Sequence, residues 1–253
     1  MELLIYNKIA DQKRLAFIVN NIKRMIPAQG MILDVGCGNG IISTTLGQLG
    51  YQVKGIDVSE KTIQKAQWHN QLANVAFEVA DAEELVTTHV TYDAIICSEV
   101  LEHLRNPSDL LQILHQLLKN TGILLVTVPN GLGPREIMVT RPTLKLRKEG
   151  GWLWKSINEV KKTLNYKGAT VQSDADNLDH IQFFSKQAIY ALSSQNDFTV
   201  ERFESTNFIE DVFPFSLLTR RFVLLQQLDC WLADHLPHFF TSGFVMVWRK
   251  TQL

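Results

Sequence analysis

Apolar and polar positions along the first half of the chain predict strands and helices in alternation. Apolar residues recur at helical spacing over residues 8–26, and Pro27 ends that helix. Short apolar runs then predict buried strands, and the stretches between them have helical character. The expected strands are residues 31–35, 52–57, 75–79, 92–97 and 122–128, and the expected helices are 41–49, 59–72 and 107–119. This alternation predicts a doubly wound α/β fold with a mostly parallel sheet.

The regular alternation stops near residue 130. Residues 131–178 have no periodic pattern and are too long for a bare loop, so we expect a helical lid insertion there. Patterns of helix, strand, amphipathic helix and strand then return at 185–195, 198–204, 216–236 and 243–249. We therefore predict a single domain over residues 1–253 that contains the 131–178 insertion.

The composition is that of an ordinary globular protein, with 45% apolar residues. A formal net charge of −1 gives no global field that would attract nucleic acid or a membrane, so such a preference needs a local patch. Three scattered cysteines, Cys37, Cys97 and Cys230, argue against a disulfide framework or a structural zinc site. The N-terminal stretch lacks the basic start and apolar run of a signal peptide, and we expect a reducing, cytoplasmic location.

Three glycines lie between the first predicted strand and the helix that follows it. Gly36, Gly38 and Gly40 allow a tight turn and let a ligand approach the backbone. The helix start adds unpaired N–H groups and a partial positive charge. Asp57 ends the second strand, where its carboxylate can accept both hydroxyls of a ribose. Glycines needed only for packing are the alternative, but the combination predicts a nucleoside site.

Two residues indicate which nucleoside is bound. A dinucleotide fingerprint needs a third glycine at position 41, where this chain has Ile41. Asp34, just before the loop, would repel a pyrophosphate but suits a cationic ligand. S-adenosylmethionine (SAM), with its sulfonium and ammonium groups, is such a ligand.

Five motifs in order resemble those of the class I SAM-dependent methyltransferases. They are LDVGCGNG, GIDVSE, ADAEEL, YDAIICSEVLEHL and GILLVTVPN. The resemblance covers roughly residues 30–130, with a weaker similarity at 180–206. It implies a seven-stranded sheet whose last strand runs antiparallel.

The resemblance also implies roles for individual residues in SAM binding. The methionine part would be held by Asp34, Gly36, Cys37, Gly38, Asn39 and Gly40. Asp57 would take the ribose hydroxyls and Val58 would pack against the adenine. Asp81 and Ala82 would meet the edge and the face of the adenine, and Ser98 would lie beneath the sulfonium.

The turn after the fourth strand carries Glu99, Glu102 and His103, which share one face at helical spacing. Two carboxylates and an imidazole suit Mg²⁺ or Mn²⁺, and His180 could be a fourth ligand. This turn resembles that of ubiquinone-biosynthesis O-methyltransferases. It is also similar to that of small-RNA 2′-O-methyltransferases, which carry a later Asp-His pair, here Asp179 and His180.

Hypotheses in which the turn binds no metal remain open. His103 could be a general base that takes a proton from an acceptor hydroxyl, or it could only cap the turn. Glu102 could face solvent. The Asp179–His180 pair could orient the substrate or order the lid.

The acceptor is the least determined part of the prediction. Basic residues exceed acidic ones over 131–168, and nearby tryptophans make peripheral membrane contact or an anionic substrate possible, with a solvated lid helix as the alternative. Nucleic acid is not expected from a single basic patch. The C-terminal end resembles bacterial methyltransferases associated with polysaccharide or lipid-linked glycan assembly. We therefore expect methyl transfer from SAM to a hydroxyl of a small or lipid-linked molecule. The alternatives are a noncatalytic SAM-binding module, a metal-assisted RNA 2′-O-methyltransferase and, against Ile41, a nicotinamide-dependent oxidoreductase.

Overall fold

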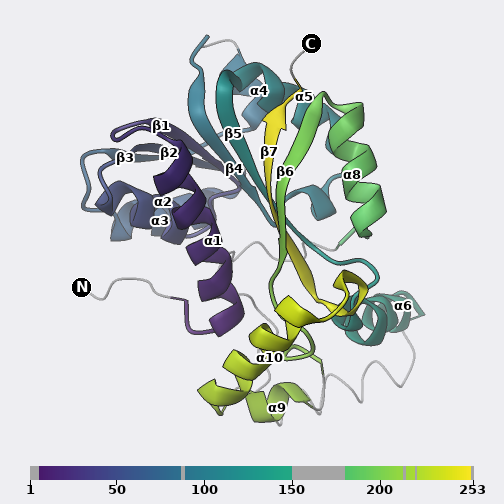
Figure 1. The fold of residues 1–253 in the computed structure, drawn as a ribbon. Helices are drawn as coiled ribbons and strands as arrows, with labels where there is room; N and C mark the ends of the chain where they lie inside the picture. The colour runs from purple at the N-terminus through teal and green to yellow at the C-terminus, as the bar shows by residue number, and fades with distance from the viewer. Residues whose placement is uncertain (1–5, 87–88, 150–179, 213–214, 220, 252–253) are drawn as a thin grey trace.

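A seven-stranded sheet forms the centre of the protein (Figure 1). The structure is a computed structural model that describes residues 6–86, 89–149, 180–212, 215–219 and 221–251. The strands follow the order β3-β2-β1-β4-β5-β7-β6. Their bounds are β1 Met31–Val35, β2 Gln52–Asp57, β3 Val75–Val79, β4 Tyr92–Ser98, β5 Leu118–Pro129, β6 Phe198–Ser205 and β7 Gly243–Lys250.

The pairing of the strands confirms the predicted fold class. Strands β1 to β5 pair in parallel. Strand β7 runs antiparallel to both β5 and β6. The chain order reverses direction between β1 and β4, so the carboxyl ends of these two strands flank the crevice where ligands bind in such sheets.

Helices cover both faces of the sheet, as a doubly wound fold requires. On one face, α1 (Ile9–Met25), α2 (Ile41–Gln48) and α3 (Glu60–His69) pack their apolar side chains on the strands. On the other face lie α4 (Ala82–Leu85), α5 (Pro107–Leu117) and α8 (Lys186–Gln195). The side chains of Ser59 and Ser185 cap the N-termini of α3 and α8.

The shorter elements gather at the carboxyl edge of the sheet. A 3₁₀ turn, η2 (Leu101–His103), follows β4, and a π-helical turn, η3 (Glu136–Thr140), continues into α6 (Arg141–Glu149). The helix predicted over 216–236 is two helices, α9 (Phe215–Thr219) and α10 (Val223–His235), because Phe222 adopts an extended backbone between them. A 3₁₀ turn, η4 (His238–Phe240), precedes β7.

The insertion predicted at 131–178 is described only up to residue 149. Residues 150–179, with Asp179 and much of the basic segment 131–168, lie outside the described residues. The lid and the membrane contact predicted for this segment therefore stay predictions. Within the described part of the chain, no helix has both the length and the apolar character needed to cross a membrane.

Candidate functional site

The glycine loop between β1 and α2 takes a conformation that requires its glycines. Gly36, Gly38 and Gly40 have φ values of 68°, 56° and 80°, in the left-handed region that side chains with a Cβ disfavour. A Cβ on Gly36 would lie 2.5 Å from the Val100 side chain, and one on Gly40 would overlap the Phe77 ring. The turn is therefore held close to β3 and η2.

Asp57 closes this loop from the end of β2. Its carboxylate accepts hydrogen bonds from the Gly38 N–H at 3.1 Å and from the Ser59 N–H at 2.9 Å. The side chain is thus fixed at the strand end, where it was predicted to meet a ribose. Val58, which was predicted to pack against the adenine, follows Asp57, and its side chain is 72% exposed and therefore accessible to a ligand.

Asp81 and Ala82, which were predicted to meet the edge and the face of the adenine, lie at the start of α4. Asp81 caps that helix by accepting from the Glu83 N–H at 3.3 Å. Ala82 is buried. Asp81 lies beyond the end of β3, the strand that pairs with β2, so it belongs to the same carboxyl edge as Asp57.

Asp34 is a buried carboxylate beneath the loop, with 1% of its surface exposed. Burial raises its pKa to about 7, and the negative charge of Asp57 adds to this, while a 2.6 Å hydrogen bond from Ser43 Oγ opposes it. A cation bound nearby would favour the ionised form. The loop predicted to bind a nucleoside thus lies above a carboxylate whose charge a cationic ligand would stabilise.

Glu99 follows β4 in a strained backbone conformation, with φ 58°. Its Oε1 accepts from Thr127 Oγ1 at 2.9 Å and lies 3.6 Å from Arg14 Nη1. Ser98 is joined to the same threonine, with 2.9 Å between the two hydroxyl oxygens. Burial alone would lower the pKa of Arg14, but Glu99 and Asp11 raise it above the ordinary value. The end of β4 is thus held by β5 and α1 together.

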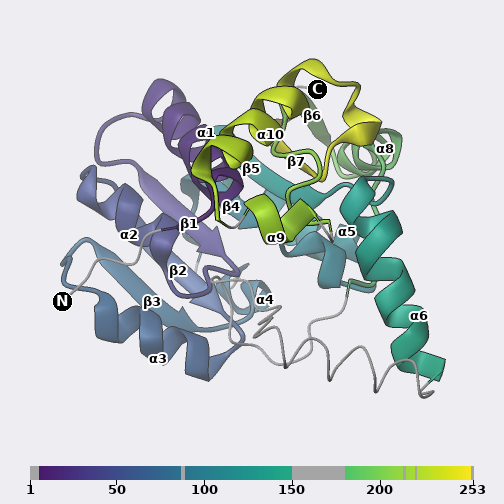
Figure 2. The ribbon, with the colours of Figure 1, turned by 90° about the horizontal axis from the view of Figure 1, so that it is seen from below.

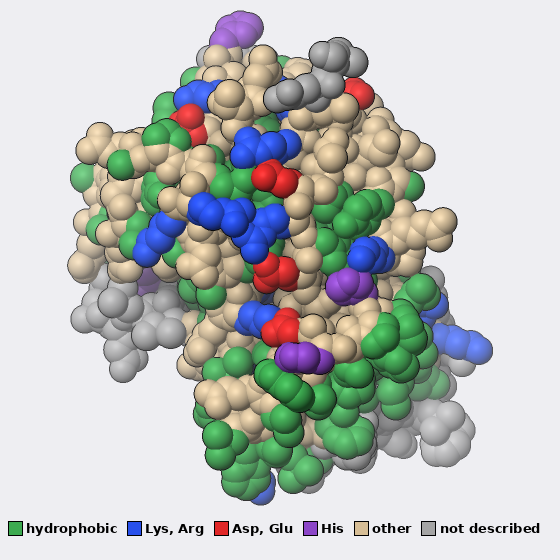
Figure 3. Space-filling view, viewed as in Figure 1, with side chains coloured by type: hydrophobic (Ala, Val, Ile, Leu, Met, Phe, Trp, Pro, Cys, Tyr) green, Lys and Arg blue, Asp and Glu red, His purple; other side chains and the backbone are tan. Residues whose placement is uncertain are grey.

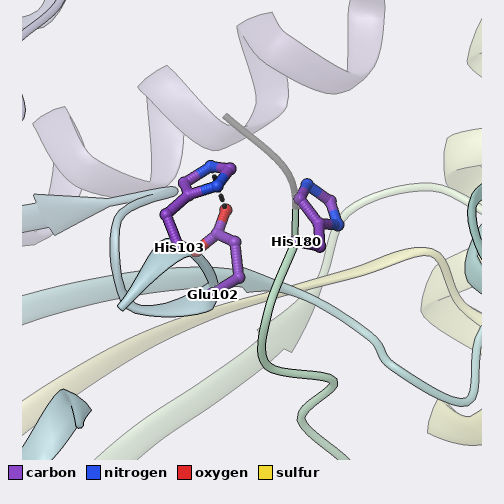
Figure 4. A group of neighbouring side chains, drawn as sticks. All are labelled: Glu102, His103 and His180. Carbon is purple, nitrogen blue, oxygen red and sulfur yellow. Dashed lines mark ion pairs between the residues drawn. The ribbon is translucent and has the colours of Figure 1, made fainter. Parts of the chain in front are cut away.

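Glu102, His103 and His180 form a cluster in which each residue offers one potential ligand atom, and these three atoms lie within 4.8 Å of one another (Figure 4). Glu102 Oε1 is 3.7 Å from His103 Nε2, and the two imidazole rings meet edge-on with centroids 5.2 Å apart. The segment at His180 reaches η2 because the N–H groups of Ile181 and Gln182 both donate to the Glu102 carbonyl. Glu99, which was predicted as a ligand together with these three residues, is not part of this cluster.

Glu136 from η3 extends the cluster. Its Oε1 lies 3.3 Å from His180 Nδ1, and its side chain is fully buried. Neither Glu136 oxygen, nor Glu102 Oε2, has a hydrogen-bond partner among the described residues. Burial raises the pKa of Glu102 well above its ordinary value, and Glu99 and Glu136 raise it further. Buried carboxylates of this kind are unfavourable unless a proton or a cation joins them.

A cavity of about 100 Å³ opens beside Glu99. It lies between the start of α1, the ends of β4 and β5, and the loops that lead into α9 and β7. Three cations and three carboxylates line it, namely Lys8, Arg14 and Arg135 with Asp11, Glu99 and Asp211. Lys8 pairs with Asp211 at 2.6 Å. The cavity is therefore polar and balanced in charge, and it adjoins the end of β4.

Several residues of the site carry no signal in the sequence pattern. Thr127, Arg14 and Glu136 contact predicted residues from elements distant in the chain, Ser43 contacts Asp34 from the start of α2, and Arg135 lines the cavity beside Glu99. Arg14 and Glu136 stand within helical segments, where a charged residue ordinarily predicts a solvated face. Only the fold shows that they point inward.

Comparison with known proteins gives consistent results. A family model described as a methyltransferase domain matches residues 9–202. The human mitochondrial ubiquinone biosynthesis O-methyltransferase is 38% identical over 131 residues, which cover 46% of this chain and 36% of that protein. The ubiquinone biosynthesis O-methyltransferase of Caulobacter vibrioides is 36% identical over 108 residues, which cover 41% of this chain and 43% of that protein. The matches thus span less than half the length of these curated relatives.

Among solved structures, the magnesium protoporphyrin IX methyltransferase of Synechocystis with bound S-adenosylhomocysteine resembles the whole chain. It aligns with a TM-score of 0.59 and 16% identity, over 99% of this chain and 90% of that one. At this identity the likeness concerns the fold.

Proposed function

Because this chain belongs to the class I SAM-dependent methyltransferases, we propose that it transfers the methyl group of SAM to a hydroxyl oxygen of a small or lipid-linked acceptor. The observation that carries the proposal is the shared edge of the sheet. The glycine loop with Asp57 and the turn with Glu99 and His103 all follow the carboxyl ends of neighbouring strands. The curated relatives named above, ubiquinone biosynthesis O-methyltransferases, support oxygen as the acceptor atom and a lipid-linked acceptor.

The cofactor would lie across the ends of β1, β2 and β4. Asp57 would receive the ribose hydroxyls, Val58 and Ala82 would flank the adenine, and Asp81 would meet its edge. The loop from Gly36 to Gly40, with Cys37 and Asn39, would hold the methionine part. Asp34 and Ser98 would face its positively charged side.

The acceptor hydroxyl would enter the cavity beside Glu99. At about 100 Å³ the cavity is smaller than the ~150 Å³ cavity that takes benzene. It therefore suits the reacting group and its nearest substituents, with the rest of the acceptor outside. Arg14 and Arg135 would hold an oxygen substituent there. Burial alone would lower the pKa of both, but neighbouring carboxylates raise it above the ordinary value, so both guanidinium groups stay charged.

Methyl transfer asks two things of these residues, alignment and proton removal. The acceptor oxygen attacks the methyl carbon, the carbon–sulfur bond breaks, and its electron pair stays on the sulfur of S-adenosylhomocysteine. The hydroxyl proton has to leave, and His103 is the base that we assign to it. His103 does not line the cavity itself, so the hydroxyl would lie at the side of the cavity where Glu99 leads into the turn with His103. Glu102, 3.7 Å away, would stabilise the imidazolium that forms.

A divalent cation is the second possibility for the same cluster, and the residues fit one. Two imidazoles, Glu102 with an unpartnered buried oxygen, and Glu136 beside His180 make a mixed nitrogen and oxygen set. Such a set suits Mn²⁺ better than Mg²⁺, which prefers oxygen ligands. When bound, the ion would lower the pKa of an acceptor hydroxyl. Glu99, tied to Thr127 and Arg14, would then be outside the ligand set.

The metal is tested by thermal stability. Mn²⁺ should raise the Tm of the wild-type protein and leave His103→Ala and His180→Ala unchanged, because a ligand stabilises only the form that binds it. His235→Ala, an exposed histidine on α10, is the matched control and should respond like wild type. Equal Mn²⁺ shifts in all four proteins would exclude the site.

The reaction is tested with methyl-labelled SAM and a panel of acceptors: phenols, dihydroxybenzenes, prenylated forms of these, and a short RNA. We expect label on a phenolic oxygen, and at least a hundredfold loss in His103→Ala. Label on RNA would favour the RNA 2′-O-methyltransferase instead. SAM binding without any transfer to a hydroxyl would favour a noncatalytic module. Neither alternative has support from the curated relatives.

The compartment is part of the same proposal. Cys37, Cys97 and Cys230 are all unpaired and buried. Burial raises the pKa of Cys230 to about 12, so its thiol stays protonated and unreactive. This agrees with a reducing, cytoplasmic setting.

A further inference from the structure

Helix α10 is turned so that its apolar side faces outward. Leu224 is 78% exposed, Leu228 50% and Trp231 55%. The buried side carries Gln226 and Asp229 together with small residues. A surface helix of a globular protein ordinarily buries its apolar stripe and exposes its polar one.

Hydrogen bonds lock this orientation. The Asp229 carboxylate accepts from the Phe208 N–H at 2.7 Å and from the Ile209 N–H at 2.8 Å. Gln226 accepts from the Ile9 N–H at 3.0 Å and donates to the Thr219 carbonyl at 2.8 Å. Rotating α10 to bury its leucines would break all of these bonds. The outward apolar side is therefore a built feature of the fold.

The neighbouring elements enlarge this surface. Exposed large side chains continue over α9, the bend after it and η4. We call this surface the apolar face and define it by six exposed side chains, those of Leu218, Phe222, Leu224, Leu228, Trp231 and Phe240. Figure 3 shows hydrophobic side chains gathered over the lower end of the molecule, where α9 and α10 lie. Contiguous exposed apolar surface of this kind marks an interaction site.

The charges around the apolar face indicate its occupant. The described residues between Phe215 and Leu228 include Arg221 and no Asp or Glu. Helix α6, which turns toward the same side as α9 and α10 in Figure 2, has four basic residues and one acidic residue. If a second copy of the chain met this face through a two-fold axis, Arg221 of one copy would lie near Arg221 of the other, and the like charges would repel. Apolar side chains bordered by basic ones suit an anionic bilayer.

We propose that the apolar face docks on the surface of an anionic lipid membrane. The cavity beside Glu99 lies next to this face, because Asp211 lines the cavity and the carbonyls of its neighbours Glu210 and Val212 accept hydrogen bonds from Thr219 and Ser216 of α9. A lipid-linked acceptor could place its hydroxyl in the cavity while its tail stays in the bilayer. This step rests on the proposed function; the docking itself does not.

The test is flotation of the full chain with vesicles. We expect binding to phosphatidylcholine vesicles that contain about one third phosphatidylglycerol, weaker binding to pure phosphatidylcholine, and weaker binding at high salt. The double variant Leu224→Gln, Leu228→Gln should reduce the bound fraction about tenfold. Arg221→Glu should reduce binding to the anionic vesicles alone. Trp68→Gln, at a 76% exposed apolar residue on α3, is the control that should bind like wild type.

Thermal unfolding and SAM calorimetry on each variant show that it is folded. Absence of flotation at low salt, or undiminished flotation of the leucine double variant, would overturn the proposal. The proposal would also be overturned if sedimentation velocity showed a wild-type dimer, the leucine double variant were a monomer, and neither protein bound vesicles. If vesicles are not bound but methyl transfer to a water-soluble phenol persists, the docking fails and the proposed function stands.

Discussion

Asp34→Asn tests the electrostatics of the cofactor site. The carboxylate is buried beneath the glycine loop, and it accepts a 2.6 Å hydrogen bond from Ser43. An asparagine oxygen can accept the same bond, so the substitution removes the charge and little else. Two opposite effects follow: the ligand-free protein becomes more stable, and SAM binds more weakly.

The size of the first effect comes from the pKa shift. The pKa of Asp34 rises from the ordinary 3.8 to about 7 in the folded protein. A shift of roughly 3 units corresponds to about 4 kcal/mol at 1.36 kcal/mol per unit. Because the folded state holds the proton more tightly, this group lowers the free energy of unfolding as pH rises from about 4 to about 7. The loss is absent below that window and constant above it.

Thermal unfolding of ligand-free wild type and Asp34→Asn between pH 4 and pH 8 measures this difference. We expect the Tm of the variant to exceed that of wild type increasingly up to about pH 7 and then by a constant amount. In calorimetry, SAM should bind wild type more tightly as pH rises toward 7, since its cationic groups favour the ionised carboxylate. The variant should lack that slope. Parallel Tm profiles for the two proteins would refute the assigned shift.

Three further substitutions test other parts of the account. Gly40→Ala should abolish SAM binding and lower the Tm, because a Cβ at φ 80° overlaps the Phe77 ring; circular dichroism and calorimetry separate the two effects. Thr127→Val should remove the hydrogen bond to Glu99 and lower kcat at unchanged fold, whereas a kcat equal to that of wild type would mean that the strained turn needs no such support. Glu210→Gln should raise the Tm above that of wild type by more at pH 9 than at pH 5, because burial, with Asp211 and Asp229 adding to it, raises the pKa of Glu210 from 4.5 to about 8, and the wild-type fold therefore loses stability as pH rises through that window.

Local signals in the sequence were sufficient for the parallel strands of the sheet and for the glycine loop, whereas the antiparallel last strand was predicted from the family resemblance. Strands β1, β2 and β4 read as apolar runs that end on glycine or a polar residue, and their parallel pairing follows from the helices between them. The positive φ at Gly36, Gly38 and Gly40 agrees with the turn that their spacing predicted.

The remainder depends on contacts between distant segments. Arg14 and Glu136 are part of the site only because α1 and η3 fold over the sheet edge. The orientation of α10 could not be read from its sequence, because apolar residues are so dense over 216–236 that periodicity does not say which side is buried. The buried anchors Gln226 and Asp229 decide it.

The pairing of Glu102 and His103 with His180 illustrates the same limit of local reasoning. Spacing placed Glu99, Glu102 and His103 on one helical face, as for an α-helical turn. The structure has a 3₁₀ turn there, and Glu99 stands before it in a left-handed conformation. Its carboxylate turns to Thr127 and Arg14 instead, and Glu136 takes the place beside His180.

Isothermal titration calorimetry with nucleoside ligands tests the central claim most directly. The glycine loop and Asp57 should bind S-adenosylhomocysteine with a Kd on the order of micromolar, about −8 kcal/mol, and should give no heat with NAD. Asp57→Ala should weaken the first interaction at least tenfold, since both ribose hydroxyls lose their acceptor. Binding of NAD in preference to S-adenosylhomocysteine, or of neither, would contradict the account.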